Sequence, residues 1–237
     1  MFLVLPLELI NTIIYFTENP VIELSLVNKC FNNNVKRIRI TNNDNYPKMK
    51  EEHLLQLPGL LKLDLSFNRV KISEKITQLK NITFLNLTDN NLITDQELSV
   101  LTNLVEINLC YDNLITDQSI SKLNNLTSLN LEGNNIITDW GISKLINLTT
   151  LGLADVKSIT DQGISNLTNL TSLNLYSTKS ITNQGLLKLD KLKKLTLQYN
   201  RLITDISHLT NLTFLNLCDN LVIKDITNLT KICHTQV

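Results

Sequence analysis

A period of 22 residues constrains this chain more than any single motif in it. Leu126, Leu129 and Leu131 open a stretch that Asn134 closes, and the same arrangement recurs one period earlier and one period later. Such a fixed period predicts a solenoid, in which each unit buries its apolar face only by stacking on its neighbours. The units begin at Leu60, Ile82, Leu104, Leu126, Leu148, Leu170, Leu192 and Leu212, so that six spacings are 22 residues and the last is 20.

Each unit follows the order Leu-x-x-Leu-x-Leu-x-x-Asn, which resembles the pattern of leucine-rich repeats. The resemblance implies an α/β solenoid: a curved horseshoe with a parallel sheet on its concave side and short α- or 3₁₀-helices on its convex side. Since side chains alternate along a strand, the three leucine-type positions should point into the core. We expect about eight repeats over residues 60–237, a cap strand and outer helix over residues 36–59, and a three-helix unit over residues 1–35.

The asparagine that closes the Leu-x-x-Leu-x-Leu-x-x-Asn stretch of a unit has a predicted structural role. Each turn of the coil leaves backbone groups outside the sheet, and a side-chain amide can bridge them because it carries both a donor and an acceptor. Asp112 can substitute only in part, and at Val156 and Thr178 we expect a local weakening. The position is held by Asn43, Asn68, Asn90, Asn134, Asn200 and Asn220.

The outer segment of most units begins with Ile-Thr-Asp, as in Ile137–Asp139. Thr or Asp before an apolar run is typical of a helix N-cap, which predicts helices of about two turns in α or 3₁₀ form. Because the unit that begins at Leu192 is two residues shorter, we expect the tighter form there. The last unit ends over residues 229–237 with no recognisable cap.

Residues 5–35 do not follow the repeat. A first predicted helix is apolar on two sides and therefore needs two packing partners. Two further helices should follow it, since Asn19-Pro20 and Asn28 are suited to helix starts. The residues that fit a known pattern are Leu5-Pro6-x-Glu8-Leu9-Ile10-x-x-Ile13-x-x-Phe16 and Leu24-Ser25-Leu26-Val27-Asn28-Lys29-x-Phe31-x-x-x-Val35.

This pattern resembles an F-box. The resemblance implies a three-helix unit that docks on the Skp-type adaptor of a cullin–RING ubiquitin ligase, while the repeats behind it hold the protein to be ubiquitinated. The alternative is that these helices only cover the open end of the solenoid, where an unpaired strand would invite aggregation. By the resemblance, the adaptor would contact Leu5, Pro6, Leu9, Ile10, Ile13, Leu24, Leu26 and Val27.

On the concave face, the positions between and just after the leucines have no predicted packing role and are candidates for contact with a partner. Protein interfaces use aromatic residues among adaptable polar groups, and clusters of exposed aromatics are uncommon elsewhere. For the asparagines alone we expect only solvation of the sheet. The candidate partner-binding residues are Phe67, Phe84, Asn86, Glu106, Asn108, Tyr111, Asn130, Glu132, Asn174, Tyr176, Tyr199 and Phe214.

Two smaller features complete the candidate list. Residues 155–158 and 177–180 form a rim where two adjacent units share Lys-Ser, and this is either a functional edge or drift of a duplicated unit. Cys110 and Cys218 should face solvent as free thiols, because no cysteine pair has the spacing of a redox or metal site.

Charge and motif content exclude other classes of function. Lys+Arg and Asp+Glu number 22 each, which leaves no charge footprint for nucleic acid or an anionic membrane. No apolar run is long enough to span a bilayer, and the apolar start lacks a basic leader, so we expect a cytoplasmic or nuclear protein that is not secreted. His53, His208 and His234 lie in different units, and no phosphate-loop or nucleophile motif occurs. We therefore expect no metal, no cofactor, no small-molecule substrate and no enzymatic activity.

These features together predict a protein–protein interaction adaptor. The main hypothesis is the substrate-recognition subunit of an SCF-type ubiquitin ligase, with the F-box on the Skp-type adaptor and the concave face on an unknown target protein. The alternative is a stand-alone leucine-rich-repeat binding or inhibitor module whose amino-terminal helices only cap the solenoid. A third hypothesis is a dimer formed through the uncapped carboxyl-terminal end.

Overall fold

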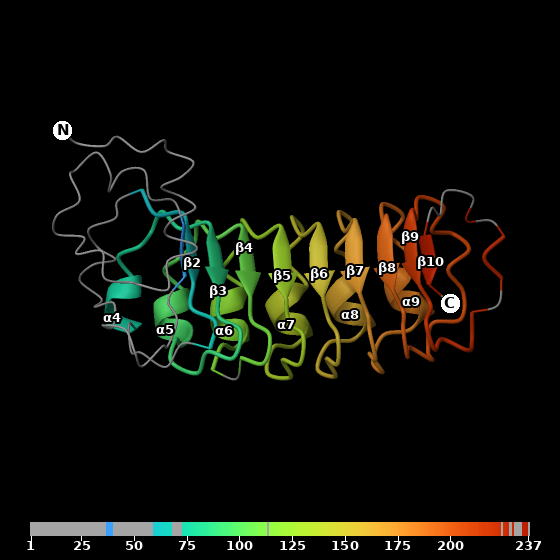
Figure 1. The fold of residues 1–237 in the computed structure, drawn as a ribbon, viewed down its shortest axis with the longest axis horizontal. Coiled ribbons are helices and arrows are strands. Elements are labelled where there is room, and N and C mark those ends of the chain that lie inside the picture. Colours follow the sequence, from blue (N-terminus) through green and yellow to red (C-terminus); the bar gives the residue numbers. More distant parts are fainter. Residues whose placement is uncertain are drawn as a thin grey trace, which may run out of the picture.

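A ten-stranded parallel sheet runs the length of the described chain (Figure 1). The computed structural model describes residues 37–39, 59–67, 73–112, 114–223, 225–227, 229 and 234–236. The strands follow one another in chain order, as expected for a coil that adds one strand per turn. They are β1 (Arg37–Arg39), β2 (Lys62–Asp64), β3 (Phe84–Asn86), β4 (Glu106–Asn108), β5 (Ser128–Asn130), β6 (Thr150–Gly152), β7 (Ser172–Asn174), β8 (Lys194–Thr196), β9 (Phe214–Asn216) and β10 (His234–Gln236).

Short helices lie on the opposite side of the coil from the strands (Figure 1). Each is a single α-helical turn of four residues, shorter than the two turns that the sequence suggested. Thr138 shows how a helix of this coil starts: its backbone is extended and its hydroxyl accepts the N–H of Trp140 at 3.3 Å, as an N-cap does. The helices are α4 (Ser73–Ile76), α5 (Asp95–Leu98), α6 (Asp117–Ile120), α7 (Asp139–Ile142), α8 (Asp161–Ile164) and α9 (Asn183–Leu186).

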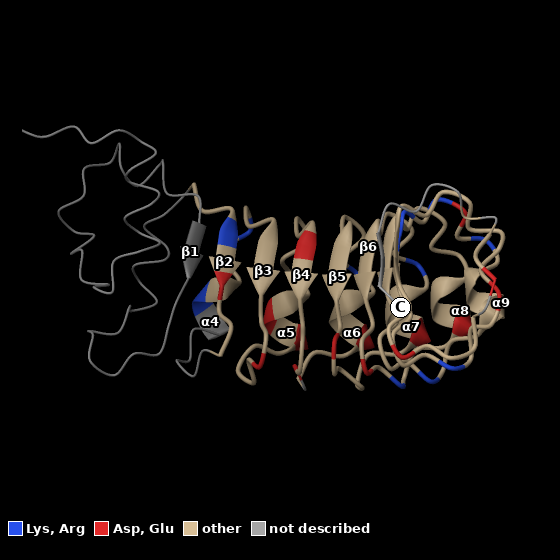
Figure 2. Ribbon diagram, turned by 45° about the vertical axis from the view of Figure 1, so that its right-hand side comes forward, with Lys and Arg blue, Asp and Glu red and all other residues tan. Residues whose placement is uncertain are grey.

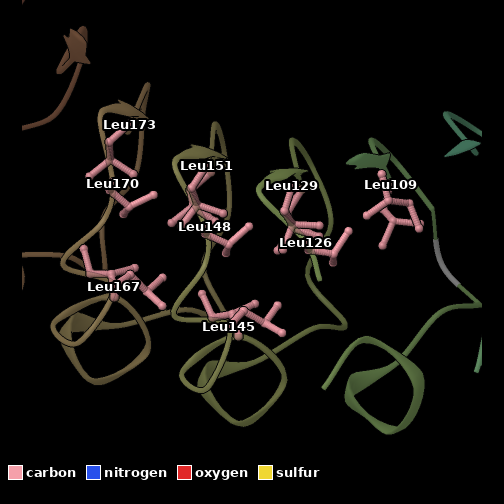
Figure 3. Close-up of a cluster of buried hydrophobic side chains, with 14 of the residues drawn as sticks. Leu109, Leu126, Leu129, Leu145, Leu148, Leu151, Leu167, Leu170 and Leu173 are labelled. Carbon is pink, nitrogen blue, oxygen red and sulfur yellow. The ribbon is translucent and has the colours of Figure 1, made fainter. Parts of the chain in front are cut away.

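The core is a stack of leucines and isoleucines, one layer per unit. Leu126, Leu129 and Leu131 from one strand region are fully or almost fully buried, and Leu145 meets them from the helix side (Figure 3). Burying one such side chain contributes roughly 1.5–3 kcal/mol, so each layer supplies a large part of the stability of its unit. The strands pair in register, so Leu129 lies between Ile107 and Leu151, and equivalent positions of successive units form columns across the sheet.

The predicted asparagine bridge is present at the four described positions that carry the asparagine. Asn134 donates its amide to the carbonyl of Asp112 at 2.9 Å, and its oxygen accepts the N–H groups of Ile136 and Ile137. Asn90, Asn200 and Asn220 make equivalent contacts. Each bridge therefore satisfies backbone groups of two units at once.

Two units lack this asparagine, and the structure shows what replaces it. The Thr178 hydroxyl donates to the carbonyl of Leu153 at 2.9 Å, whereas Val156 has no polar side-chain atom. In both units a serine two residues further on donates to a carbonyl of the preceding unit, Ser158 to Ile137 and Ser180 to Ile159, at 2.5 Å each. The altered rim at residues 155–158 and 177–180 thus has a structural cause, and the serines offset the weakening expected there.

The Ile-Thr-Asp motif makes a second ladder, on the helix side. Asp139 lies in the first turn of α7. Its carboxylate accepts the backbone N–H and the hydroxyl of Thr160 in the next unit, at 2.8 and 2.6 Å. A Cβ on Gly163 would lie 2.3 Å from the Asp139 oxygen, so glycine leaves room for this contact. Asp95, Asp117, Asp161 and Asn183 make the corresponding contacts to Thr116, Thr138, Thr182 and Thr204.

The carboxyl-terminal half of the coil differs from the prediction in one helix and one strand. In the unit that begins at Leu192, which is two residues shorter than the units before it, residues 200–211 contain bends and turns but no helix of either type. The carboxyl-terminal segment also contributes a strand that was not predicted: β10 pairs with β9, and His234–Gln236 contains no leucine that could have indicated it. The proposed F-box and its eight adaptor-contact residues lie outside the described residues.

Candidate functional site

The strands end in a row of turns that determines how side chains are presented on the sheet face. The third residue after each of β2 to β9 has a φ between +49° and +66°, in the left-handed region that costs non-glycine residues energy. The asparagine at the strand end stabilises this turn: the oxygen of Asn108 accepts the N–H of Cys110, and that of Asn174 accepts the N–H of Tyr176, both at 3.0 Å. The turn residues are Phe67, Asp89, Tyr111, Gly133, Asp155, Ser177, Tyr199 and Asp219.

The strand-end asparagines proposed for the partner surface therefore have a structural role that the sequence analysis missed. Asn86 accepts both the N–H and the hydroxyl of Thr88, and Asn130 accepts the N–H of Glu132. Each side-chain oxygen is committed to its own turn, which goes beyond the solvation expected of these residues. The sequence signal was an asparagine two residues before the N–H that its side chain accepts, which is the spacing of an Asx turn.

The aromatic candidates occupy two kinds of position. Phe84 and Phe214 open their strands and are half-buried, and the ammonium of Lys62 lies 5.7 Å from the centre of the Phe84 ring. Phe67, Tyr111 and Tyr199 are turn residues whose side chains are 57%, 52% and 43% exposed. Large apolar surface is thus displayed along the ends of the strands.

Two tyrosine groups stand on either side of the middle of this face. The Tyr176 and Tyr199 rings, from adjacent units, pack edge to face with 5.5 Å between their centres. The Tyr111 ring lies over Gly133 of the next unit: a Cβ built on Gly133 would be only 2.3 Å from Cε1 of the ring. Only glycine at residue 133 leaves room for the Tyr111 ring in this position. In the other group, the edge-to-face pairing of the two rings adds stability beyond the area that they bury.

Carboxylates lie close to both tyrosine groups. The charge of Glu132, then burial and the charge of Asp155, raise the pKa of Tyr111 above its usual value. A hydrogen bond with Asp219 is the main cause that raises the pKa of Tyr199. Figure 2 shows charges of both signs scattered along the coil rather than gathered on one face.

The cysteine prediction was half right. Cys110 and Cys218 are free thiols, but Cys110 is buried rather than facing solvent, and Cys218 is partly buried. Burial, with a contribution from Glu132, raises the pKa of Cys110 to about 11. A thiol with such a pKa is a poor nucleophile, so Cys110 acts as a small core residue.

In the part of the chain that the structure describes, no cluster of three or more His, Cys, Asp or Glu side chains could hold a metal ion. Within the same residues, no helix has the length and apolar character needed to cross a bilayer. His208, one of the three histidines, is instead within hydrogen-bonding distance (3.1 Å) of the carbonyl of Leu186, in the preceding unit.

Comparison with known proteins supports the repeat assignment. The family described as Leucine Rich repeat matches residues 78–96, 122–146 and 166–189. The pattern, the one-strand-per-turn sheet and this match agree on leucine-rich repeats in the matched part of the chain. A sequence search of curated proteins found no match.

Solved structures share the fold at low sequence identity. Internalin C2 of Listeria monocytogenes is 23% identical with a TM-score of 0.57, over 89% of this chain and 84% of that one. An internalin of the same organism, InlF, is 20% identical with a TM-score of 0.57, over 86% and 68% of the two chains. TLR13, solved as a complex with a single-stranded RNA, is 23% identical with a TM-score of 0.65, over 91% of this chain and 37% of that one. At this level of identity the likeness shows the fold alone.

Proposed function

We propose that this chain is a protein-binding module whose binding surface is the sheet face at the ends of strands β4 to β8. The observation that carries the proposal is the set of tyrosines there: Tyr111 and Tyr199 are exposed, and the half-buried Tyr176 packs against Tyr199. Tyrosines held rigidly by their backbone and by ring contacts lose little entropy on binding, and they are common among residues that dominate interface energies.

A selection of peptides from a random phage-displayed library, carried out on the full chain, tests this proposal. Selected peptides should bind a Tyr111→Ala/Tyr176→Ala/Tyr199→Ala variant at least tenfold more weakly, because truncation of an interface hot spot costs about 2 kcal/mol or more. Trp140→Ala is the matched control, since Trp140 is 61% exposed in α7 on the helix side. Peptides that bind the triple variant as well as the wild type, but lose binding to Trp140→Ala, would move the function to the other face.

The narrower hypothesis, an SCF-type substrate receptor, stays a proposal that rests on the F-box resemblance of residues 5–35. It is tested by co-purification with a Skp-type adaptor, repeated with Ile10→Asp and Ile13→Asp. Loss of the adaptor in both variants, with the repeats still folded, supports the receptor; absence of the adaptor from the wild-type preparation leaves the stand-alone module. The cytoplasmic or nuclear location likewise stays a prediction.

A further inference from the structure

Three strand-end asparagines present their amide nitrogens, and not their oxygens, to whatever meets this face. The side-chain oxygens of Asn108, Asn130 and Asn174 each accept a backbone N–H of their own turn, at 3.0, 3.2 and 3.0 Å. Because a backbone N–H can only donate, the atom that meets it must be the amide oxygen, and the nitrogen is the remaining atom of the group. Among the described residues, no protein group accepts a hydrogen bond from these three nitrogens.

These nitrogens are also not buried. Within the described part of the chain, the one buried side-chain nitrogen or oxygen without a partner is Oδ2 of Asp112, so the three amide nitrogens reach the surface. The three side chains as a whole are half-buried, which fixes the direction of each amide. They are therefore oriented donors with free capacity.

The three donors belong to the face that carries the tyrosines. Asn108 and Asn130 are register partners on adjacent strands, so their backbones are about 4.8 Å apart. Asn130 and Asn174 lie on either side of Gly152, which has no side chain, at roughly 10 Å from each other. Tyr111 follows Asn108 by three residues. The face proposed for binding thus has a row of donors whose matching oxygens are already in use.

A row of donors selects a partner that brings acceptors. A carboxylate is a poor choice here, because the exposed Glu106 lies on the same face two residues before Asn108, and Glu132 lies two residues after Asn130. A second copy of this chain is a poor choice too, since its own asparagine row would set donors against donors. Main-chain carbonyl groups are uncharged, and in an extended segment they are free, whereas a helix uses them internally.

We propose that Asn108, Asn130 and Asn174 determine the specificity of this face by donating to main-chain carbonyl oxygens of an extended partner segment without acidic residues. This inference rests on the proposed function, because it names the partner chemistry of the same face. The tyrosines supply contact area, and the amides select the backbone that lies along the strand ends.

The first test measures the affinity of the strongest phage-selected peptide that depends on the tyrosines. Asn108→Asp keeps an oxygen for the turn but removes the donor; Asp64 shows that this works, since it accepts the N–H of Ser66 at 3.0 Å. The peptide should bind Asn108→Asp, and separately Asn130→Asp, at least fivefold more weakly, because the new carboxylate oxygen cannot donate to a carbonyl.

Asn216→Asp is the matched control. Asn216 accepts the N–H of Cys218 at 3.0 Å, as Asn108 does that of Cys110, but it lies on β9, outside the proposed face. The control changes charge and turn in the same way and should leave the affinity unchanged.

A second measurement uses the wild-type chain and does not depend on the folding of a variant. Replacement of a single peptide amide by an ester weakens that carbonyl as an acceptor. At a contacting position the ester should weaken binding roughly threefold or more, and this loss should disappear in Asn108→Asp or Asn130→Asp.

Three outcomes contradict the inference: peptides whose affinity depends on an Asp or Glu side chain, equal affinity for Asn108→Asp and Asn216→Asp, or no ester position that weakens binding. In each of these, peptides that still depend on Tyr111, Tyr176 and Tyr199 leave the protein-binding function standing. If no peptide depends on those tyrosines, the proposed function itself fails, and the two failures are thereby distinguished.

Discussion

At the scale of single residues, one substitution in a ladder leaves a buried charge unsatisfied. Asp112 stands where Asn90 and Asn134 form bridges, and its Oδ1 accepts the N–H groups of Leu114 and Ile115 as theirs do. Its Oδ2, however, is the one buried side-chain oxygen or nitrogen without a hydrogen-bond partner in the described part of the chain. A carboxylate cannot donate to the carbonyl that an amide would reach, so this unit carries a local cost.

Asp112→Asn should therefore stabilise the protein. The new amide can donate to a carbonyl of the preceding unit, as Asn134 does to Asp112, and the buried charge is removed. We expect the free energy of unfolding at pH 7 to rise by about 1–3 kcal/mol, measured by urea denaturation. The reciprocal variant Asn134→Asp is the control and should be destabilising by a similar amount. No change in either variant would mean that the unpartnered oxygen has no energetic consequence.

The same residue predicts a pH dependence. Burial raises the pKa of Asp112 from 3.8 to about 6 in the folded chain, so the folded state holds this proton more tightly than the unfolded state. The stabilisation from the protonated form is fully present below about pH 4 and is lost as the pH rises through 6. The stability advantage of Asp112→Asn over wild type should accordingly grow between pH 4 and pH 6 and then stay constant. An advantage that is equal at pH 4 and pH 7 contradicts this assignment.

At the scale of the element, the helical turns are held less by their own hydrogen bonds than by contacts with neighbouring turns. Four residues are too few for a stable isolated helix, because nucleation is unfavourable. In α7 the cap residue Thr138 bonds to Asp117 of the preceding unit, and Asp139 bonds to Thr160 of the next. One Thr-Asp pair therefore both starts its own helix and positions the next one.

Removal of one such carboxylate tests this account. Asp139→Ala leaves the half-buried N–H and the hydroxyl of Thr160 without their acceptor, and we expect a loss of about 1–3 kcal/mol in unfolding free energy. Asp139→Asn should cost clearly less, since the Asn183 amide oxygen accepts the N–H of Thr204 in the next unit and its amide nitrogen donates to the Thr204 hydroxyl. The measurement is urea unfolding followed by circular dichroism. Equal losses in the two variants would assign the effect to charge instead of hydrogen bonding.

At the scale of the whole molecule, stability is expected to be close to a sum over units and the contacts between neighbours. The parallel register repeats every 22 residues through most of the sheet, so no strand depends on a distant one. A whole unit of 22 residues can therefore be deleted, because the strands on either side carry equivalent residues and can pair in the same register.

Deletion of residues 126–147 should consequently give a folded, shorter solenoid. Strand β4 would then pair with β6, and Asp117 would meet Thr160 as it now meets Thr138. We expect an unchanged circular-dichroism shape and a lower melting temperature, because one layer of core is lost. Deletion of residues 126–146 is the control: the one-residue slip exchanges inward and outward positions and should prevent folding. If both deletions fold equally well, the register argument is wrong.

The sequence by itself determined the repeating fold of this protein, because a period of 22 residues with three inward leucines can bury its apolar surface only by stacking. It also determined the bridging asparagines and the threonine caps, whose chemistry acts within a few residues or between equivalent positions. The F-box resemblance stays a prediction from the sequence.

Only the tertiary structure decided what depends on contacts between units. The Thr-Asp ladder, the serines that replace the missing bridges, the burial of Cys110 and the placement of Tyr111 over Gly133 all join residues about 22 positions apart. Local patterns carry no information about such contacts until the register of the stack is known. The strand β10 was missed for the related reason that backbone pairing at the end of a sheet does not require leucines.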